Sequence, residues 1–348
     1  MKKKSIINLI KYYSEENDAG FRNEAYEIAR DFEATGDYQL AEYIIALMSN
    51  ANAFIPQTDE MNTSYFEKVN PTNERLPLPE LIEQDLLGVI RAINRNSGIH
   101  KFLFQGAPGT GKTESVKQVA RILKRELYAV NFAAVIDSKL GQTQKNIADL
   151  FKELASLQSP EKVVILFDEI DAIALDRTNN NDVREMGRVT SSILRELDRL
   201  DERIVLIATT NLFQFIDKAL TRRFDFIIDF NRYTQRDLLQ ISEILLDYYL
   251  QRFKCSGRNI RLFRKIIGLM NPIPYPGDLK NMIKTAVAFC DPTIELDYLK
   301  RLYKDIDNYD ISDLKHLQGR GFTLREIEVL TGVSKSQVAR ELKEVNNE

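Results

Sequence analysis

The sequence contains few of the residues that build metal sites and disulfide frameworks. Its 348 residues include two cysteines, Cys255 and Cys290, two histidines, His100 and His316, and no tryptophan. Two cysteines give no disulfide framework, which favours a reducing compartment. The histidines are far apart, without metal-ligand spacing, and no H-E-x-x-H motif is present. These absences argue against a protease and against a disulfide-stabilised fold.

Long apolar runs and a strong charge of one sign are also missing. No run of about 18 apolar residues occurs, and the apolar stretch behind Lys2–Lys4 is too short for a signal peptide. The 48 Lys and Arg nearly balance the 51 Asp and Glu, leaving a net charge of −3 and no general argument for nucleic acid or a membrane surface. We therefore expect a cytoplasmic protein with no membrane partner.

The most informative pattern lies at residues 106–113, which read Gly-Ala-Pro-Gly-Thr-Gly-Lys-Thr. It matches the phosphate-binding loop G-x-x-x-x-G-K-[ST], whose glycines let backbone N–H groups point at phosphate oxygens. An apolar run, Phe102–Phe104, precedes it, and apolar residues at helical spacing follow it. This order predicts a nucleotide site at a helix N-terminus, where Lys112 reaches the phosphates and Thr113 ligates Mg²⁺. Its expected lining residues are Gly106, Ala107, Pro108, Gly109, Thr110, Gly111, Lys112, Thr113 and Glu114.

Two further strand-like runs end in polar residues. Val163–Phe167 is followed by Asp168 and Glu169. Ile204–Ala208 is followed shortly by Asn211. Beside the phosphate loop, Asp168 is placed to hold Mg²⁺ and Glu169 to polarise the attacking water. Asn211 is placed to bind the γ-phosphate or that water, although asparagine is also common in turns at strand ends.

These runs belong to an alternating series of strand and helix patterns. Such a series predicts an α/β fold whose parallel sheet is covered by helices on both faces. Ligands of such sheets bind beyond the carboxyl ends of the strands. The strand-like runs lie at 101–105, 127–132, 162–167, 203–208 and 224–230.

Together, these motifs resemble the AAA family, a branch of the AAA+ P-loop ATPases. In that family's terms, residues 106–113 are Walker A, Asp168–Glu169 are Walker B and Asn211 is sensor 1. The resemblance covers about residues 76–306. It implies a parallel-sheet core with a helical lid, and hydrolysis of ATP with Mg²⁺ as cofactor.

The segment Asp217–Asp225 is similar to the family's second region of homology, which carries arginine fingers. Arg222 and Arg223 are adjacent here, without the usual Pro-Gly between them, a shortened form associated with bacterial members. In the family a finger acts on the ATP of the neighbouring subunit, so the resemblance implies a homo-oligomeric ring, usually a hexamer. Which arginine is the finger stays open, and the alternative is that both only pair with local acids.

Two segments depart from the family's pattern. Where its first pore loop carries an aromatic that grips an extended polypeptide, this chain has Lys139 followed by Leu140. The change weakens the case for threading, because lysine offers an aliphatic stem with a charged tip. A ring of lysines favours an acidic peptide or a phosphate backbone, and the alternative is a solvated lysine that grips nothing. Lys280 lies in the sensor 2 region, where it either touches the γ-phosphate or occupies the surface of a lid helix.

The local patterns divide the chain into five parts. Residues 1–50 read as a helical module, because Ala25, Ile28 and Ala29 keep a helical period and a second apolar stripe follows at 40–47. We expect this module to bind a protein client. The other parts are a linker at 51–75, the large ATPase subdomain at 76–231, a helical lid at 232–306 and a C-terminal segment at 307–348.

Residues 321–345 resemble a helix-turn-helix. Thr323 and Glu326 are placed to form a capping box on the first helix. Gly332 supplies the turn, and Ser334 caps the second helix. Apolar residues of both helices share a small core, namely Ile327, Leu330, Val338 and Leu342.

The second helix of this segment would present Lys335, Gln337 and Arg340 to DNA. Two features speak against that contact. Glu328 stands where such motifs usually have a small residue, and the segment is neutral overall, although phosphate contacts dominate DNA affinity. The alternative is a helical tail that docks on the lid or on a protein partner.

The sequence thus favours an ATP-driven ring that remodels or disassembles a protein client, with proteolysis only through a separate partner enzyme. A DNA-associated ATPase targeted by the C-terminal segment is the second hypothesis. A nucleotide-gated scaffold with negligible turnover is the third. Glu169, Asn211 and the paired arginines argue against the scaffold, because it needs none of them.

Overall fold

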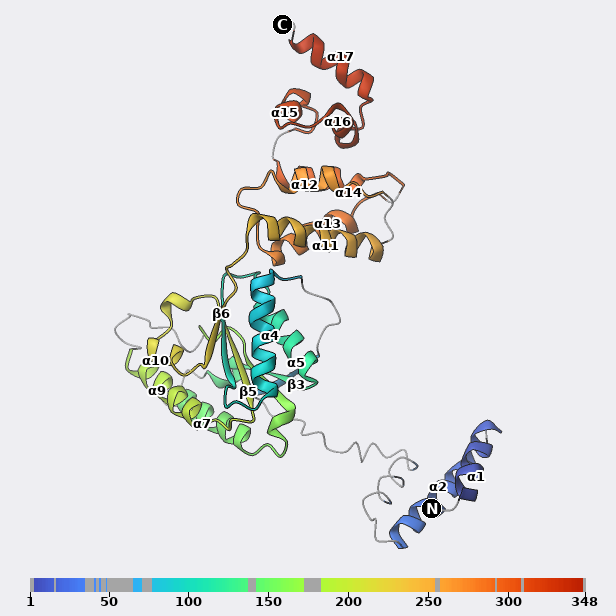
Figure 1. Cartoon of the computed structure of the whole chain (residues 1–348), viewed down its shortest axis with the longest axis vertical. Helices are drawn as coiled ribbons and strands as arrows, with labels where there is room; N and C mark the ends of the chain where they lie inside the picture. The colour runs from blue at the N-terminus through green and yellow to red at the C-terminus, as the bar shows by residue number, and fades with distance from the viewer. Residues whose placement is uncertain are drawn as a thin grey trace. The chain divides into compact units, whose positions relative to one another are not determined.

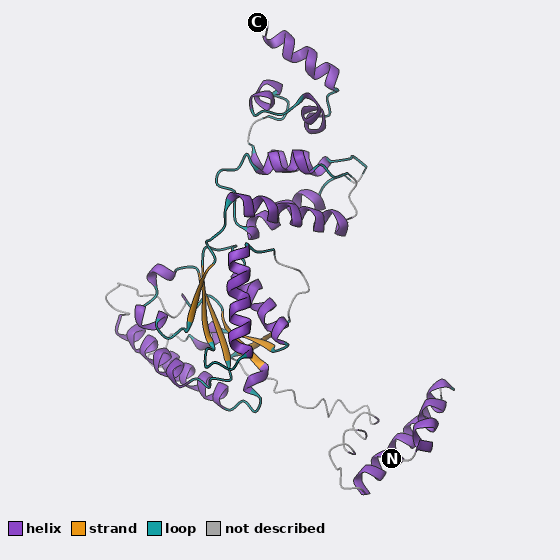
Figure 2. Ribbon diagram, in the orientation of Figure 1, coloured by secondary structure: helices purple, strands orange, loops and turns teal. Residues whose placement is uncertain are grey.

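The chain forms two compact units, Met1–Asn62 and Thr63–Glu348. The first is helical where it is described, and the second contains a sheet between helices, followed by further helices (Figures 1 and 2). The structure is a computed structural model and describes residues 3–15, 17–34, 41, 44, 48, 65–70, 77–136, 142–171, 183–253, 257–291, 293–307 and 310–346.

The first unit contains a hairpin of α1 (Lys3–Ser14) and α2 (Asp18–Ala34). The helical period predicted around residues 25–32 is confirmed as part of α2. The helix α1 was not predicted, and the apolar stripe at 40–47 lies mostly outside the described residues. The buried residues of α2 are Ala25, Ile28 and Ala29.

The second unit is built on a six-stranded sheet with the order β1-β3-β4-β5-β2-β6. Neighbouring strands are parallel, except that β1 pairs antiparallel with β3. This confirms the predicted α/β fold with a largely parallel sheet. The strands are β1 (Phe66–Val69), β2 (Lys101–Gln105), β3 (Glu126–Val130), β4 (Val163–Phe167), β5 (Val205–Thr210) and β6 (Phe226–Asp229).

The edge strand β1 lies within the stretch that was predicted to be a linker, so that prediction was wrong for these four residues. Phe66 is buried and pairs with Val130, and Lys68 Nζ lies 2.7 Å from Glu126 Oε1. A four-residue strand with one buried side chain has too little alternation for sequence periodicity to detect.

Helices cover both faces of the sheet, as predicted (Figure 2). Val164 and Leu166 of β4 pack with α4 and α5, whereas Phe167 meets Phe151 of α7 with ring centroids 6.0 Å apart. Because both faces are covered, all five residues of β4 are buried, and the strand reads as one unbroken apolar run. The helices of this part are α4 (Glu80–Asn94), α5 (Lys112–Leu123), α6 (Phe132–Val135), α7 (Gln142–Ala155), α9 (Val183–Arg199) and α10 (Lys218–Thr221), with short 3-10 turns at Pro160–Lys162 and Phe213–Phe215.

All described elements after β6 are helical. The four helices of the predicted lid region are α11 (Gln235–Phe253), α12 (Ile260–Ile267), α13 (Pro276–Ala288) and α14 (Asp297–Ile306). The C-terminal helices are α15 (Leu314–Gly319), α16 (Leu324–Thr331) and α17 (Lys335–Asn346). In the part of the chain that the structure describes, no helix has both the length and the apolar character needed to cross a membrane.

The lid and the C-terminal helices share one hydrophobic core. Tyr303 of α14 meets Phe322 edge-on, with ring centroids 5.6 Å apart. Lys265 of α12 donates to Gly321 O at 2.6 Å and to Glu326 Oε2 at 2.7 Å. The lid at 232–306 and the C-terminal segment at 307–348 were predicted as separate parts, but they do not have separate cores.

The caps predicted in the C-terminal segment are present. Thr323 and Glu326 form a capping box, and Gly332 ends α16 with φ at 79°. At the start of α17, the Gln337 N–H lies 3.4 Å from Ser334 Oγ. Glu328 stands where helix-turn-helix motifs usually have a small residue. Its carboxylate accepts the Lys335 N–H at 3.1 Å and so caps α17 from the preceding helix. The apolar residues predicted for this core are all buried, namely Ile327, Leu330, Val338 and Leu342.

The shared core predicts that damage to α16 also loosens the lid. Leu330 is fully buried, so Leu330→Ala should lower the free energy of unfolding by about 2–5 kcal/mol. Hydrogen exchange should quicken in α12 and α14 as well as in α15–α17. The exposed Lys335→Ala is the matched control and should change stability by less than about 0.5 kcal/mol. Faster exchange confined to α15–α17 would contradict a common core.

Candidate functional site

The predicted phosphate loop joins the end of β2 to the start of α5. Gly109 has φ at 78°, and Gly111, the N-cap of α5, has φ at 91°. Glycine adopts these left-handed conformations without the strain that a Cβ atom brings. The loop therefore wraps around the N-terminus of α5, where backbone N–H groups favour an anion.

Lys112 is buried inside this loop, with 7% of its surface exposed. Its Nζ donates to Gly106 O at 2.6 Å, to Ala107 O at 2.9 Å and to Asn211 Oδ1 at 2.8 Å. The ammonium group thus links the loop to the end of β5, as expected if Lys112 and Asn211 serve one site.

Burial lowers the pKa of Lys112 from 10.5 to about 8. Removing an ammonium group from water disfavours its charged form. The nearby carboxylates of Asp168, Asp171 and Glu169 oppose this shift. The site therefore holds a cation that is protonated at neutral pH and loses its proton in mildly alkaline solution.

Two hydroxyl groups converge on the Asp168 carboxylate. Thr113 Oγ1 donates to Asp168 Oδ1 at 2.9 Å, and Thr209 Oγ1 donates to the same oxygen at 2.6 Å. The Thr113 and Asp168 oxygens are the hard ligands that Mg²⁺ prefers. No group of three or more His, Cys, Asp or Glu side chains is placed to hold a metal among the described residues. This donor set fits Mg²⁺, which commonly takes one or two protein oxygens and completes its shell with water and substrate phosphates.

Glu169 has a backbone conformation that is uncommon for a residue with a Cβ atom, with φ at 53°. Its N–H donates to Thr209 Oγ1 at 2.9 Å. Its Oε1 accepts from Asn211 Nδ2 at 3.1 Å, and the residue is exposed. Such backbone outliers cluster at functional sites, and here the outlier turns a carboxylate toward the sensor side chain.

No role was predicted for Asp171, the third acid of the sequence Asp-Glu-Ile-Asp at residues 168–171. It is buried and accepts from the Thr210 hydroxyl and from the Asn211 N–H, the latter at 3.0 Å. These contacts fix the end of β5 and the direction of the Asn211 side chain. The sequence signal that could have identified Asp171 was an acidic residue three positions after Asp168.

Most residues predicted for the nucleotide site line one cavity of about 270 Å³, whereas Gly106, Ala107 and Thr110 of the loop do not line it. The phosphate loop at residues 106–113, from here on called the P-loop, forms one wall of the cavity. The ends of the strands and the N-terminus of α13 form the others. Lys280 lines it from the lid side, as the sensor 2 hypothesis requires. Its lining residues include Pro108, Gly109, Gly111, Lys112, Thr113, Glu114, Asp168, Glu169, Thr209 and Asn211.

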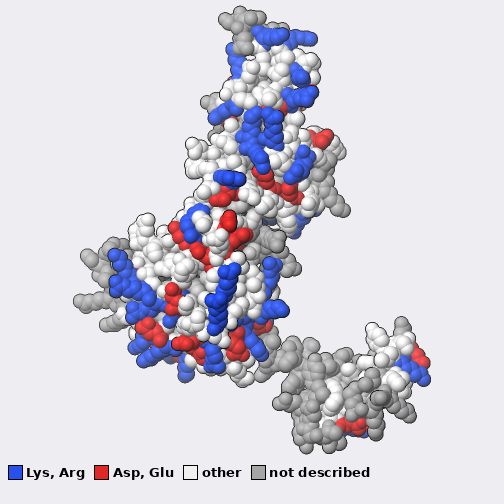
Figure 3. Space-filling model, viewed as in Figure 1, with Lys and Arg blue, Asp and Glu red and all other residues white. Residues whose placement is uncertain are grey.

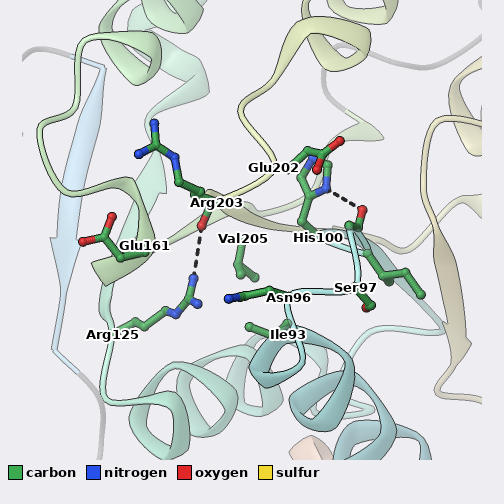
Figure 4. A pocket seen from close by; sticks show the side chains of 11 residues that line it. Ile93, Asn96, Ser97, His100, Arg125, Glu161, Glu202, Arg203 and Val205 are labelled. Atoms are coloured by element: carbon green, nitrogen blue, oxygen red, sulfur yellow. Dashed lines mark hydrogen bonds between the residues drawn. The ribbon is translucent and has the colours of Figure 1, made fainter.

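A larger hollow of about 400 Å³ lies near the opposite ends of the strands (Figure 4). Arg125, which precedes β3, donates there to Arg203 O at 3.3 Å. The two arginines share the hollow with Glu161 and Glu202, and no glycine-rich loop borders it. Its charge is balanced, so the smaller P-loop cavity is the better anion site.

The two predicted finger arginines have different surroundings. Arg223 binds Asp198 of α9 through two nitrogens, with Nε 3.1 Å from Oδ1 and Nη2 3.2 Å from Oδ2. Arg222 is exposed, and its guanidinium has no hydrogen-bond or ion-pair partner within the described ranges. The alternative of local pairing thus describes Arg223 and not Arg222.

The remaining predicted residues are those of the pore loop and of α17. The pore-loop residues Lys139 and Leu140 are outside the described residues. Lys335, Gln337 and Arg340 are exposed on α17.

Comparisons with known proteins match the ATPase region. The family model described as "ATPase family associated with various cellular activities (AAA)" matches residues 102–232. A Sinorhizobium fredii protein named uncharacterized AAA family ATPase y4kL is 34% identical over 183 residues, which are 50% of this chain and 54% of that protein. Proteasome-activating nucleotidase 2 of Haloferax volcanii is 32% identical over 192 residues, 52% of this chain and 45% of that protein. The chain therefore spans about half the length of these curated relatives.

Solved structures show the same fold. The FIGL-1 AAA domain aligns with a TM-score of 0.53 at 18% identity and covers 74% of this chain and 91% of that chain. A chain of the E. coli MS115-1 HORMA:CdnC:Trip13 complex aligns with a TM-score of 0.54 at 18% identity, covering 69% and 94%. With Lys112, Thr113, Asp168, Glu169 and Asn211 gathered in the matched region, this chain carries an ATPase domain of the AAA family at residues 102–232.

Proposed function

We propose that this protein binds ATP with Mg²⁺, hydrolyses it in a homo-oligomeric ring of six subunits, and uses the cycle to remodel a protein client. The observation that carries the proposal is the arrangement of Lys112, Thr113, Asp168, Glu169 and Asn211 around the P-loop cavity. These residues supply a cation, two oxygen ligands, a carboxylate for water and an amide in one place. Phosphoryl transfer needs little more than positioning and charge neutralisation.

Each side chain has a distinct role in this proposal. Lys112 binds the β- and γ-phosphates, and Thr113 with Asp168 holds Mg²⁺, which neutralises phosphate charge when bound. Glu169 orients and polarises the attacking water. Asn211 keeps Glu169 in place through the 3.1 Å contact and lies ready to bind the γ-phosphate or the water.

We assign the trans-acting finger to Arg222. A finger must reach a neighbouring subunit, which an exposed guanidinium can do and a paired one cannot do without breaking its ion pair. Arg223 holds the short helix α10 against α9 through Asp198 and so supports the position of Arg222. A ring follows from this assignment, because the finger of one subunit completes the site of the next.

A protein client is supported by the names of relatives, among them proteasome-activating nucleotidases and a putative 26S proteasome regulatory subunit homolog. The helical module predicted at residues 1–50 is the expected client-binding part. Lys139 and Leu140 remain the expected pore-loop residues. A partner protease or other separate enzyme would be recruited by the ring, and a cytoplasmic location remains a prediction from the scarcity of cysteine.

The second candidate function is a DNA-associated ATPase. Its specific support is the exposure of Lys335, Gln337 and Arg340 on α17, together with the basic side chains over the C-terminal helices on the face seen in Figure 3. Glu328 weakens this candidate, because its carboxylate occupies the N-terminus of α17, where a phosphate would otherwise be favoured. Lys280 is the expected lid contact with the γ-phosphate in either case.

The pKa of Lys112 predicts how ATP affinity depends on pH. Bound phosphate stabilises the ammonium form, so ATP binding takes up a proton wherever free Lys112 is deprotonated. Affinity should be constant near pH 7 and fall above about pH 8, by up to about tenfold per pH unit. Equilibrium titration with Mg-ATP at pH 7 and pH 9 tests this. Lys112→Arg is the control, because its guanidinium keeps its proton over this range. Equal wild-type affinity at both pH values would refute the assignment.

Glu169→Gln should bind ATP normally, lower turnover by at least about 10²-fold and lock the assembled ring. Purified with ATP from its own cells, this variant should retain its client, which mass spectrometry can identify. Lys112→Ala, which should not bind ATP, is the control for nonspecific capture. A retained protein released by deleting residues 1–50 supports the remodeller. Retained DNA that is lost with Lys335→Ala and Arg340→Ala supports the second candidate, and wild-type turnover would show that another group handles the water.

Arg222→Ala should lower hydrolysis by about 10³-fold or more while sparing ATP binding. Mixing it with Lys112→Ala subunits should restore part of the activity, because the second variant supplies an intact arginine to the first. Arg223→Ala is the matched comparison and should lose less activity. Absence of any rescue would argue against a finger that acts between subunits.

A further inference from the structure

The connection between β6 and α11 runs directly beside the P-loop. Asn231, in this connection, accepts the Ala107 N–H through Oδ1 at 2.8 Å. Its Nδ2 donates to Asp229 Oδ1 at 3.0 Å, which fixes the orientation of the amide and keeps Oδ1 turned to the loop. The Asn231 side chain therefore holds the connection to the start of the P-loop, in addition to the pairing of β6 with β2 in the sheet.

Tyr233, two residues further on, makes a second contact. Its hydroxyl donates to Thr110 O at 2.7 Å, and its ring meets Tyr275 of the lid at a centroid distance of 5.8 Å. Burial raises the pKa of Tyr233 well above its usual range. The phenol is thus a hydrogen-bond donor at any physiological pH, and its ring touches the lid while its hydroxyl touches the loop.

The lid itself makes a third contact. The Gly277 N–H donates to Gly109 O at 2.8 Å. A Cβ atom on Gly277 would come within 2.8 Å of Gly109 Cα, so the two backbones meet as closely as glycine allows. The N-terminal turn of α13 is seated on the P-loop by this contact.

These three contacts leave the N–H groups from Gly109 onward available to a phosphate. Two of them engage carbonyl oxygens, those of Gly109 and Thr110, which repel an anion. The third engages the N–H of Ala107, at the start of the loop and just before Pro108, which has no N–H. The N–H groups from Gly109 onward, which point at phosphate in such loops, take no part in them. Phosphate and lid can therefore hold the loop simultaneously.

We propose that Asn231 and Tyr233 are positioning residues that couple phosphate binding at the P-loop to the seating of the lid. A phosphate that orders the loop also orders the carbonyl of Thr110 and the N–H of Ala107, which favours both side-chain contacts. By linkage, a seated lid strengthens phosphate binding by the same factor. The inference rests on the proposed ATP binding and adds the residues through which it reaches the lid.

The core end of the connection is anchored separately. Arg232 pairs with Asp85 of α4 and donates through Nε to Asp229 O at 2.9 Å. Because Arg232 is bound to the core, the connection between β6 and α11 does not move as a whole when the P-loop shifts. The shift therefore reaches the lid through the contacts of Tyr233 and Gly277 with the P-loop.

Hydrogen exchange with and without magnesium and a non-hydrolysable ATP analogue tests the coupling in the full-length protein. In the wild type the analogue should slow exchange in α5 and also in α11 and α13. Tyr233→Phe keeps the ring but removes the donor, and Asn231→Ala removes the acceptor. Each variant should still show slowed exchange in α5, but the slowing in α11 and α13 should shrink at least threefold. Affinity for the analogue and kcat should each fall by about three- to tenfold, the factor expected for one hydrogen bond.

Tyr248→Phe is the matched control, because this lid tyrosine accepts from Arg252 at 2.9 Å and does not line the P-loop cavity. It should respond to the analogue like the wild type. The inference is overturned if Tyr233→Phe and Asn231→Ala transmit the analogue's effect to the lid unchanged, or if either loses nucleotide binding altogether. A wild-type protein that neither binds nor hydrolyses ATP would instead refute the proposed function itself.

Discussion

Parallel strands end at the same edge of a sheet, and this constraint brings Lys112, Asp168, Glu169 and Asn211 together at the P-loop cavity. The loop with Lys112 follows β2, Asp168 and Glu169 follow β4, and Asn211 follows β5, which lies between β2 and β4. The amide of Asn211 is therefore central. Its oxygen accepts from Lys112 at 2.8 Å, and its nitrogen donates to Glu169 at 3.1 Å. A side chain with both a donor and an acceptor suits the middle strand, because its two neighbours carry opposite charges.

Threonine hydroxyls hold the acidic groups of the site in place. Thr209 and Thr113 donate to Asp168, and Thr210 donates to Asp171. A half-buried carboxylate is costly unless it is hydrogen-bonded, and the hydroxyls supply these bonds without adding charge. The carboxylates in turn offset part of the cost of burying the Lys112 ammonium group. Acids, hydroxyls and lysine thus stabilise one another before any substrate arrives, which limits the rearrangement needed for catalysis.

Much of this architecture could be predicted from the sequence, because the spacing of residues 106–113, Asp168–Glu169 and Asn211 is local to each strand end. What could not be predicted depends on contacts between distant segments. The strand β1 is defined by its pairing with β3, and Asp171 has a role only because β5 brings Thr210 beside it. The cap that Glu328 places on α17 requires knowledge of the turn between two helices.

The boundary between the lid and the C-terminal helices also depends on tertiary contacts that local sequence patterns do not reveal. A helical lid was evident from periodicity. Its common core with α15–α17 depends on Phe322 meeting Tyr303 and Lys265, which precede it by 19 and 57 residues in the sequence. The difference between Arg222 and Arg223 likewise depends on the position of Asp198 in the preceding helix.

The close approach of Gly109 and Gly277 has a consequence for how this protein can evolve. A methyl group at residue 277 would overlap the Cα of residue 109, more than 160 positions away in the chain. A larger residue at 277 is tolerable only if the backbone of Gly109 retreats, whereas Gly109 is restricted by its own φ of 78° and not by the space around it. A residue other than glycine at position 277 is therefore expected only in related proteins whose phosphate loop lies further from the lid, so this one position records the contact between loop and lid in the sequence itself.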